Sequence, residues 1–190
     1  MLSITDLKIG ATFILDNQPY EVLQYKHSHI GRGGSNVQVK IRNLITGAML
    51  NRSFKQADQF EEAEIEKIKS KFIYSSKGQY FFHPENDPKN RFFIASETIG
   101  EKIKYLKPNL IVDVLYFQEK PVNISLPIKI DLKVMECPPN IKGNTAQGGT
   151  KTVTLETGMT LNAPMFINQG DIVRVNTEKD EYTERVEISK

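Results

Sequence analysis

Few side chains in this sequence combine the type and the spacing that catalysis requires. Cys137 follows Glu136 and precedes two prolines, with no histidine nearby, and a lone cysteine is most often a small buried hydrophobe. Asp171 and Glu156 are better explained as turn and strand-face residues than as an acid–base pair. No glycine-rich phosphate loop lies between a strand and a helix. The sequence therefore predicts a protein without a catalytic residue of its own.

Metal binding is the property that the histidines could support. His27 and His29 are two residues apart, so on a strand both would face the same side. His83 is the only other histidine and there is no cysteine partner, so a metal site would need carboxylates from elsewhere. We interpret His27 and His29 as surface residues and predict no metal site.

Residues 30–35 are the remaining candidate, because they place one arginine among three glycines. Gly31, Gly33 and Gly34 leave the backbone little steric restriction, so it could approach another surface closely. Arg32 would then present an always-charged guanidinium with five donors. The alternative is an ordinary glycine-rich hairpin turn with a solvated arginine, and the motif alone leaves both open.

The charge pattern favours a partner that carries phosphate. The chain has 25 Lys and Arg against 23 Asp and Glu, a formal net charge of +2, yet residues 22–57 contain no acid. The cations of this acid-free stretch are Lys26, Arg32, Lys40, Arg42, Arg52 and Lys55. Such a stretch produces a local positive field that attracts nucleic-acid backbones and weakens with salt. A solvated hairpin whose acids lie elsewhere is the alternative.

Length and composition bound the class of protein. With 190 residues, 39% of them hydrophobic and 25% charged, the chain is expected to fold as one domain or two to three small ones. A single cysteine excludes an internal disulfide framework and indicates a reducing compartment. No apolar run approaches the roughly 20 residues that cross a bilayer, and residues 1–6 lack the profile of a signal peptide. We therefore expect a cytoplasmic protein.

Short strands separated by turn residues account for most of the chain. Residues 37–42 alternate strictly between apolar and polar side chains, which predicts a strand with its cations on the polar face. Residues 12–15 and 20–25 have the pattern of a hairpin. The first third, residues 1–64, is therefore predicted to be a small SH3-like barrel.

The middle third, residues 65–126, continues the strand pattern with one short helix expected over residues 97–105. Strands with one helical insertion predict a five-stranded barrel of the OB type. Residues 61–71 hold the strongest cluster of helix formers, although 65–68 equally suit a strand. This third also holds a group of aromatic residues, and we favour the interpretation that they fill the barrel core. The alternative is that they stack on bases. The residues are Tyr80, Phe81, Phe82, Phe92 and Phe93.

The last third, residues 127–190, repeats the same rhythm. Strands are predicted over residues 128–134, 153–156, 165–167, 171–175 and 182–188. This pattern indicates another small barrel, so the predicted fold class is all-β with three small barrels. Barrels of about 60 residues have individually thin cores, which predicts an extended molecule with long binding surfaces.

Ordered blocks of sequence carry a family resemblance. The arginine loop runs into residues 37–47, and the last third holds three further blocks: 142–146, 148–151 with 154–158, and 170–177 with 181–185. With these residues the chain resembles bacterial elongation factor P over essentially its whole length. The middle third is similar mainly in layout.

The resemblance implies an SH3/KOW-like domain and two OB-like domains in an elongated L similar to tRNA. It implies a monomer that binds the 70S ribosome between the P and E sites and contacts peptidyl-tRNA, ribosomal RNA and proteins near the exit site. The factor would promote peptide-bond formation where consecutive prolines stall the ribosome. Ribosomal RNA would perform the chemistry, so the protein would not be an enzyme, and no membrane takes part.

The resemblance also implies roles for individual residues. Arg32 would reach the acceptor end of the tRNA, while Gly31, Gly33 and Gly34 would let the backbone pass close to RNA. The other residues implied to contact RNA or the ribosome are Lys26, Lys40 and Arg42 in the first domain and Lys151, Tyr182 and Arg185 in the last.

Arg32 is also the implied modification site. Many family members carry a modified lysine there, and a branch with arginine is rhamnosylated on it, which implies a tip-modifying enzyme as a partner. Ile30 stands where the family usually has proline. The alternative is that the bare guanidinium suffices, because it already donates to phosphate in bidentate fashion.

Two other functions fit the same sequence. One is that of an elongation-factor-P-like paralogue with a different task. The other is that of a general single-strand RNA-binding OB protein, whose aromatic residues would stack on bases.

Overall fold

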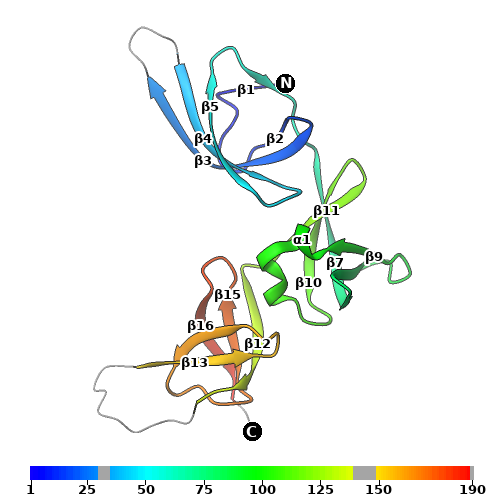
Figure 1. The fold of residues 1–190 in the computed structure, drawn as a ribbon, viewed down its shortest axis with the longest axis vertical. Coiled ribbons are helices and arrows are strands. Elements are labelled where there is room, and N and C mark those ends of the chain that lie inside the picture. Colours follow the sequence, from blue (N-terminus) through cyan, green and yellow to red (C-terminus); the bar gives the residue numbers. More distant parts are fainter. Residues whose placement is uncertain (30–34, 139–148, 189–190) are drawn as a thin grey trace.

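A computed structural model describes residues 1–29, 35–138 and 149–188. Three small β-barrels follow one another along the long axis of an elongated molecule (Figure 1). Strands form nearly all of the regular structure, so the predicted all-β class is confirmed. Within the described ranges, helical residues occur in α1 (Ser96–Ile99) and the 3-10 helix η1 (Gly100–Tyr105), which begin one residue before the predicted segment 97–105 and end with it.

The first barrel is built from a four-stranded sheet and a short two-stranded one. Its main strands, in spatial order, are β2 (Thr12–Leu15), β3 (Gln18–His29), β4 (Ser35–Asn43) and β5 (Met49–Lys55). The short sheet pairs β1 (Leu2–Ser3) with β6 (Gln59–Phe60). The alternation predicted for residues 37–42 is confirmed, because Val37, Val39 and Ile41 are all buried.

A buried asparagine shapes the turn between β4 and β5. The Asn43 side chain is 2% exposed, and its Oδ1 accepts hydrogen bonds from the backbone N–H groups of Ile45 and Thr46, both at 2.9 Å. Its amide nitrogen donates to Gln18 Oε1 on β3. Gly47 then adopts a φ of +76°, which a residue with a side chain rarely does. These contacts fix the register of β4 and β5.

The middle barrel has five strands with the first in the centre. Their spatial order is β11 (Lys120–Ser125), β10 (Ile111–Phe117), β7 (Ile65–Ser76), β8 (Gln79–Pro84) and β9 (Phe92–Ala95). The helical segment connects β9 to β10, as expected for an OB-type barrel. The helix considered for residues 61–71 is not formed, because β7 pairs with β10 on one side and β8 on the other. Pairing on both edges outweighs local helix propensity.

The last barrel repeats this strand order. It reads β14 (Thr160–Pro164), β13 (Thr150–Leu155), β12 (Lys129–Glu136), β15 (Ile172–Asn176) and β16 (Glu181–Glu187). The strand predicted at residues 165–167 is wrong. These residues form a turn in which the Ile167 N–H donates to the Pro164 carbonyl at 3.1 Å. Ile167 is fully buried, which explains why this short apolar segment has the sequence pattern of a strand.

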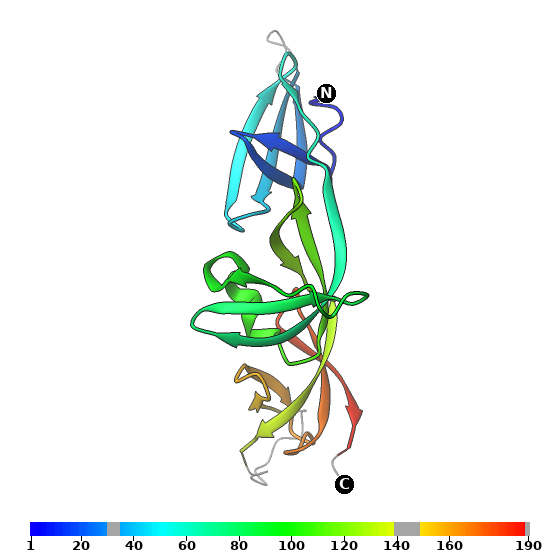
Figure 2. The same ribbon diagram turned by 90° about the vertical axis from the view of Figure 1, so that its right-hand side faces the viewer.

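Long strands carry the chain from one barrel to the next. Figure 2 shows β7 running from the first barrel into the middle one and β12 running from the middle barrel into the last. Contacts between barrels occur at both junctions. The domain bounds of 1–64, 65–126 and 127–190 stay a prediction.

An apolar cluster joins the first barrel to the middle one. Leu44 and Ala63 of the first barrel belong to one buried cluster with Leu115, Phe117 and Val122 of the middle barrel. Burial of such a cluster stabilises the junction roughly in proportion to the apolar area removed from water. The two barrels therefore share a small core.

Polar groups complete the same junction. Asn123 is 3% exposed, and its amide nitrogen donates to the carbonyls of Thr98 at 3.1 Å and Ile45 at 3.4 Å, which lie in different barrels. Lys102 Nζ donates to Asn123 Oδ1 at 3.2 Å. Burial, with the charge of Arg42 adding to it, lowers the pKa of Lys102 to about 8. Buried polar groups need hydrogen-bond partners, and the Asn123 amide has both of its acceptors only when the first and middle barrels are in contact.

The junction between the middle and last barrels depends on Tyr105. This residue of η1 is 2% exposed and packs in the core of the last barrel. Its hydroxyl donates to Asp180, which also lies 2.7 Å from Lys104 Nζ. Burial raises the pKa of Tyr105 far above its usual value, and the bond to Asp180 acts in the same direction. Lys107 adds an ion pair with Glu156 at 3.0 Å.

We expect Tyr105→Ala to destabilise the protein by about 3–5 kcal/mol, because truncating a buried aromatic side chain leaves a cavity. Tyr105→Phe keeps the ring and loses the hydrogen bond, so it should cost about 1 kcal/mol. Urea unfolding followed by circular dichroism measures both changes. Tyr74→Ala is the matched control, because Tyr74 is 45% exposed. An equal loss for Tyr105→Ala and Tyr74→Ala would contradict the proposed junction.

Candidate nucleic-acid interface

The outer face of the β3–β4–β5 sheet gathers cations and amides from three strands. Cross-strand register aligns them in rows, because residues directly opposite each other in paired strands share a face. The rows are Lys26–Gln38–Ser53, Gln24–Lys40–Asn51 and Glu21–Arg42–Met49. We call these nine residues the cationic face. A bulge between Val22 and Gln24 interrupts the alternation of β3, so Glu21 lies on the same face as Gln24 and Lys26 while Val22 is buried.

The cations of this face differ in their exposure and in whether an acid neutralises their charge. Arg42 forms an ion pair with Glu21, with Arg42 NH2 2.6 Å from Glu21 Oε2, so its charge is largely balanced. Lys26 is exposed and Lys40 is half-buried. Glu21 is the one acid among the nine residues of the cationic face. Lys26 and Lys40 therefore supply the positive field of this face, while Arg42 contributes less than the sequence suggested.

The cationic face leads toward the predicted arginine loop. β3 and β4 remain paired as far as His29 and Ser35, and the five residues between them include Arg32. The predicted site residues Gly31, Arg32, Gly33 and Gly34 lie outside the described residues.

No group of three metal-binding side chains occurs among residues 1–29, 35–138 and 149–188. His27 is exposed and lies opposite Val37 on β4. Over the same ranges, no helix is long and apolar enough to cross a membrane.

The predicted contact residues of the last barrel lie on a separate part of the molecule. Lys151 is 8% exposed and its Nζ donates to the Pro138 carbonyl at 3.5 Å, so it offers little surface to a partner. The Arg185 guanidinium lies 5.0 Å from the ring centre of Phe166 and 3.5 Å from Asp171 Oδ2. The structure therefore does not bring these residues together with the cationic face.

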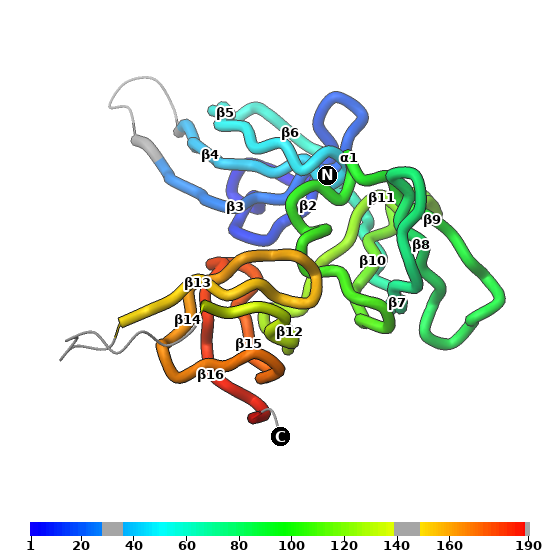
Figure 3. Tube along the Cα trace, turned by 60° about the horizontal axis from the view of Figure 1, so that its bottom comes forward, coloured from blue at the N-terminus to red at the C-terminus, as the bar shows by residue number. Residues whose placement is uncertain are grey.

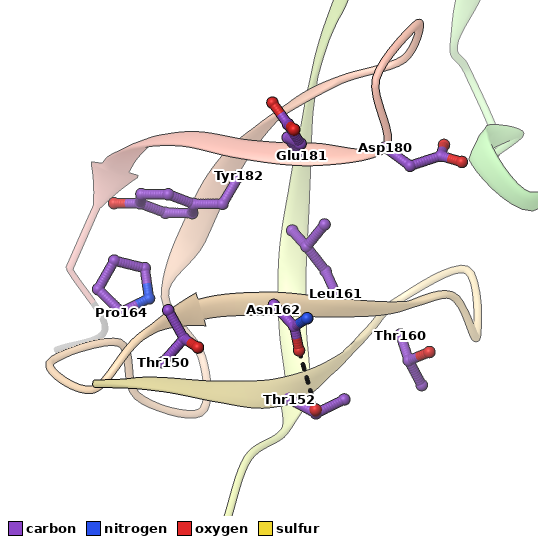
Figure 4. A pocket seen from close by; sticks show the side chains of 9 residues that line it. All are labelled: Thr150, Thr152, Thr160, Leu161, Asn162, Pro164, Asp180, Glu181 and Tyr182. Carbon is purple, nitrogen blue, oxygen red and sulfur yellow. Dashed lines mark hydrogen bonds between the residues drawn. The ribbon is translucent and has the colours of Figure 1, made fainter. Parts of the chain in front are cut away.

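Tyr182 lines an open cavity of about 760 Å³ between β13, β14 and β16 (Figure 4). Its ring lies beside Pro164, whereas Asp180 points away toward the middle barrel. Thr152 donates to the Asn162 side-chain oxygen at 3.0 Å on the cavity floor. The lining is made of hydroxyl, amide, apolar and acidic groups without a lysine or arginine. It is therefore poorly suited to phosphate.

The aromatic residues of the middle barrel divide between two faces. Phe82 is buried, and Tyr80 and Phe92 pack against the same core, as predicted. The core interpretation is wrong for Phe93, which is 50% exposed, and for Phe81, which faces outward beside it. The sequence pattern did not predict that Tyr74 would be exposed, yet its ring stacks on Phe81 on the same outward face.

Comparison with known families matches both ends of the chain. Residues 3–60 match the elongation factor P (EF-P) KOW-like domain, and residues 130–185 match the model described as elongation factor P, C-terminal. Among solved structures, translation initiation factor 5A from Methanococcus jannaschii aligns with a TM-score of 0.53 at 16% identity. That alignment covers 66% of this chain and 91% of the other, and it shows a shared fold.

Similar proteins extend over nearly the whole chain. Elongation factor P of Desulfotalea psychrophila is 38% identical over 186 residues, covering 98% of this chain and 99% of its own. Elongation factor P of Carboxydothermus hydrogenoformans is 34% identical over 186 residues, covering 98% of this chain and all of its own.

A KOW-like barrel with a cationic hairpin face, followed by two OB-like barrels, defines the class of this protein as a translation factor. The matches along the full chain then decide the family. The chain belongs to the elongation factor P family, and it is a translation elongation factor.

We expect Lys40→Gln and Lys26→Gln each to weaken binding to ribosomes that carry peptidyl-tRNA, and to do so most at low salt. Each lost phosphate contact should lower the slope of log affinity against log salt by about 0.7–0.9. Co-sedimentation over a salt series measures the slope. The control is Lys8→Gln, an exposed lysine of the same barrel outside the cationic face. Identical slopes for all three variants and the wild type would rule out phosphate contacts by this face.

Proposed function

We propose that this protein binds the ribosome between the P and E sites, contacts peptidyl-tRNA and stimulates peptide-bond formation where consecutive prolines stall translation. The observation that carries the proposal is the cationic face. Its rows run along β3 and β4 toward the strand ends that flank Arg32, and the last row contains Lys26 and Gln38. A surface of lysines and amides is suited to a phosphate backbone, because both groups donate hydrogen bonds to phosphate oxygens.

The proposed mechanism is positioning, with Arg32 as the group that contacts the tRNA acceptor end. Proline has a ring-locked φ and reacts slowly, so a stalled peptidyl-tRNA gains most from being held in a reactive geometry. The Arg32 guanidinium would donate to backbone phosphates in bidentate fashion. Gly31, Gly33 and Gly34 would let the backbone come close to RNA. Ribosomal RNA would carry out the reaction, so the factor would not itself be an enzyme.

Charge arrangement along the hairpin supports this role for Arg32. Residues 22–57 contain no acid, so Glu21 is the one acid among the nine residues of the cationic face. Asp58 follows this stretch and accepts a hydrogen bond from the Lys55 N–H at 2.8 Å, at the end of β5 that pairs with Asn36. Glu21 is held in its ion pair with Arg42 at the end of the hairpin remote from Arg32. Between Glu21 and Arg32 the sequence therefore holds Lys26 and no acid.

Arg32 is also the proposed modification site. We propose that a tip-modifying enzyme rhamnosylates it, which would extend its reach and add hydroxyl donors and acceptors. Intact-mass measurement of the natively expressed protein tests this point separately from ribosome binding. A mass equal to that of the bare chain would exclude the modification.

The remaining partners follow from the same proposal. The protein would act in the cytoplasm as a monomer, with the last barrel near ribosomal RNA or proteins of the exit site. Tyr182 and Arg185 are half-buried residues that still expose part of their side chains for such contacts. Lys151 would contribute through packing against the Pro138 carbonyl rather than by direct contact.

We expect Arg32→Ala to abolish most of the rescue of a polyproline reporter in cells that lack their own elongation factor P. Arg32→Lys should retain part of it, because the charge is kept and the bidentate geometry is lost. Arg52→Ala is the matched control, since Arg52 is an exposed arginine of the same barrel on the other side of β5. Full rescue by Arg32→Ala, or an equal loss in Arg52→Ala, would refute the role of Arg32.

A further inference from the structure

Three aromatic rings form an exposed row across the middle barrel. Tyr74 is 45% exposed and Phe93 is 50% exposed, with Phe81 between them. The Tyr74 and Phe81 rings stack at 4.7 Å between centroids with an interplanar angle of 17°, and Phe81 lies 5.9 Å from Phe93. We call these three residues the aromatic row. Large exposed apolar groups that lie together mark interaction sites in soluble proteins.

A bulge in β7 brings Tyr74 into this row. Strict alternation would place Tyr74 on the same face as Phe72, which is buried. The register instead shifts between them, so that Phe72 lies opposite Phe82 and Tyr74 lies opposite Phe81. One extra residue in the strand thus turns a core position into a surface position. The backbone bulge is therefore the reason why Tyr74 is exposed.

The strands that carry the row are the first, second and third of the OB-type barrel. Phe81 lies on β8 and Phe93 on β9, the second and third strands. The face of strands two and three is where OB barrels bind oligonucleotides. The aromatic row therefore occupies the part of the fold that is best shaped to hold a nucleic-acid strand.

Cations border the aromatic row. Lys71 lies opposite His83 in the neighbouring outward row, and Lys77 lies in the turn between β7 and β8 at the other end. In residues 65–95, six basic side chains outnumber three acidic ones: Lys67, Lys69, Lys71, Lys77, Lys89 and Arg91 against Glu66, Glu85 and Asp87. Protein-binding surfaces are depleted of lysine, whereas aromatic rings between cations bind single-stranded nucleic acid.

This surface is distinct from the cationic face of the first barrel. Figure 3 shows β8 and β9 on the opposite side of the molecule from the ends of β3 and β4. We propose that the outer face of β7, β8 and β9 binds unpaired RNA, with bases stacked on the aromatic row and phosphates beside Lys71 and Lys77. The proposal adds a second RNA contact to the factor and does not depend on the role of Arg32.

The test uses the full-length protein and a fluorescein-labelled oligouridylate of about ten nucleotides, a length suited to one OB barrel. Fluorescence anisotropy measures the affinity. Phe93→Ala and Tyr74→Ala should each weaken binding about tenfold to a hundredfold, because each removes a stacking partner. Ile128→Ala is the control, since Ile128 is an apolar residue of the last barrel that is 56% exposed and lies outside the proposed contact residues, and it should leave the affinity unchanged.

Salt dependence separates stacking from charge. Lys71→Gln should lower the slope of log affinity against log salt by about 0.7, whereas Phe93→Ala should leave that slope unchanged. Thermal unfolding of each variant shows whether the barrel remains folded. Equal oligouridylate affinity in wild type, Phe93→Ala and Tyr74→Ala would overturn the proposal. Weaker ribosome co-sedimentation of Phe93→Ala with unchanged oligouridylate affinity would also overturn it, and would assign the face to a protein partner.

Discussion

The ring of Tyr105 lies in the core of the neighbouring barrel, and the extended shape of the molecule depends on this contact and its counterpart at the other junction. Barrels of this size bury little surface on their own. A domain interface that is small and polar would let them move relative to one another. Here each junction instead combines shared apolar packing with hydrogen bonds that require both partners, such as those of Asn123. The barrels can therefore act as one elongated body.

The extended body explains why the proposed binding surfaces are faces and hairpin ends rather than pockets. The cavity beside Tyr182 is open and lacks cations. The cationic face, by contrast, lies along β3 and β4, with Lys26 and Lys40 in successive rows. Such a surface suits a long polyanion, since several weak phosphate contacts add up along a backbone. Under the proposed function, the arrangement of the barrels would decide which part of the partner Arg32 contacts.

The sequence predicted features that depend on local pattern and missed those that depend on register or tertiary contact. The alternation of residues 37–42 identified both faces of β4 correctly. The bulge beside Tyr74 could not be inferred, because alternation alone places that ring in the core. The pairing of Arg42 with Glu21 likewise depends on how two strands align. Nothing local distinguishes Tyr105, which is buried by another barrel, from an ordinary residue of a short helix.

Directed hydroxyl-radical probing tests the central claim most directly, namely that the end of the β3–β4 hairpin is held at the acceptor end of peptidyl-tRNA. An iron chelate would be tethered to a Ser35→Cys variant in a Cys137→Ser background, which removes the natural thiol. On ribosomes stalled at consecutive prolines, we expect strand scission at the acceptor end of the tRNA in the P site. Scission confined to the anticodon arm, or to RNA remote from the peptidyl-transferase centre, would contradict the account.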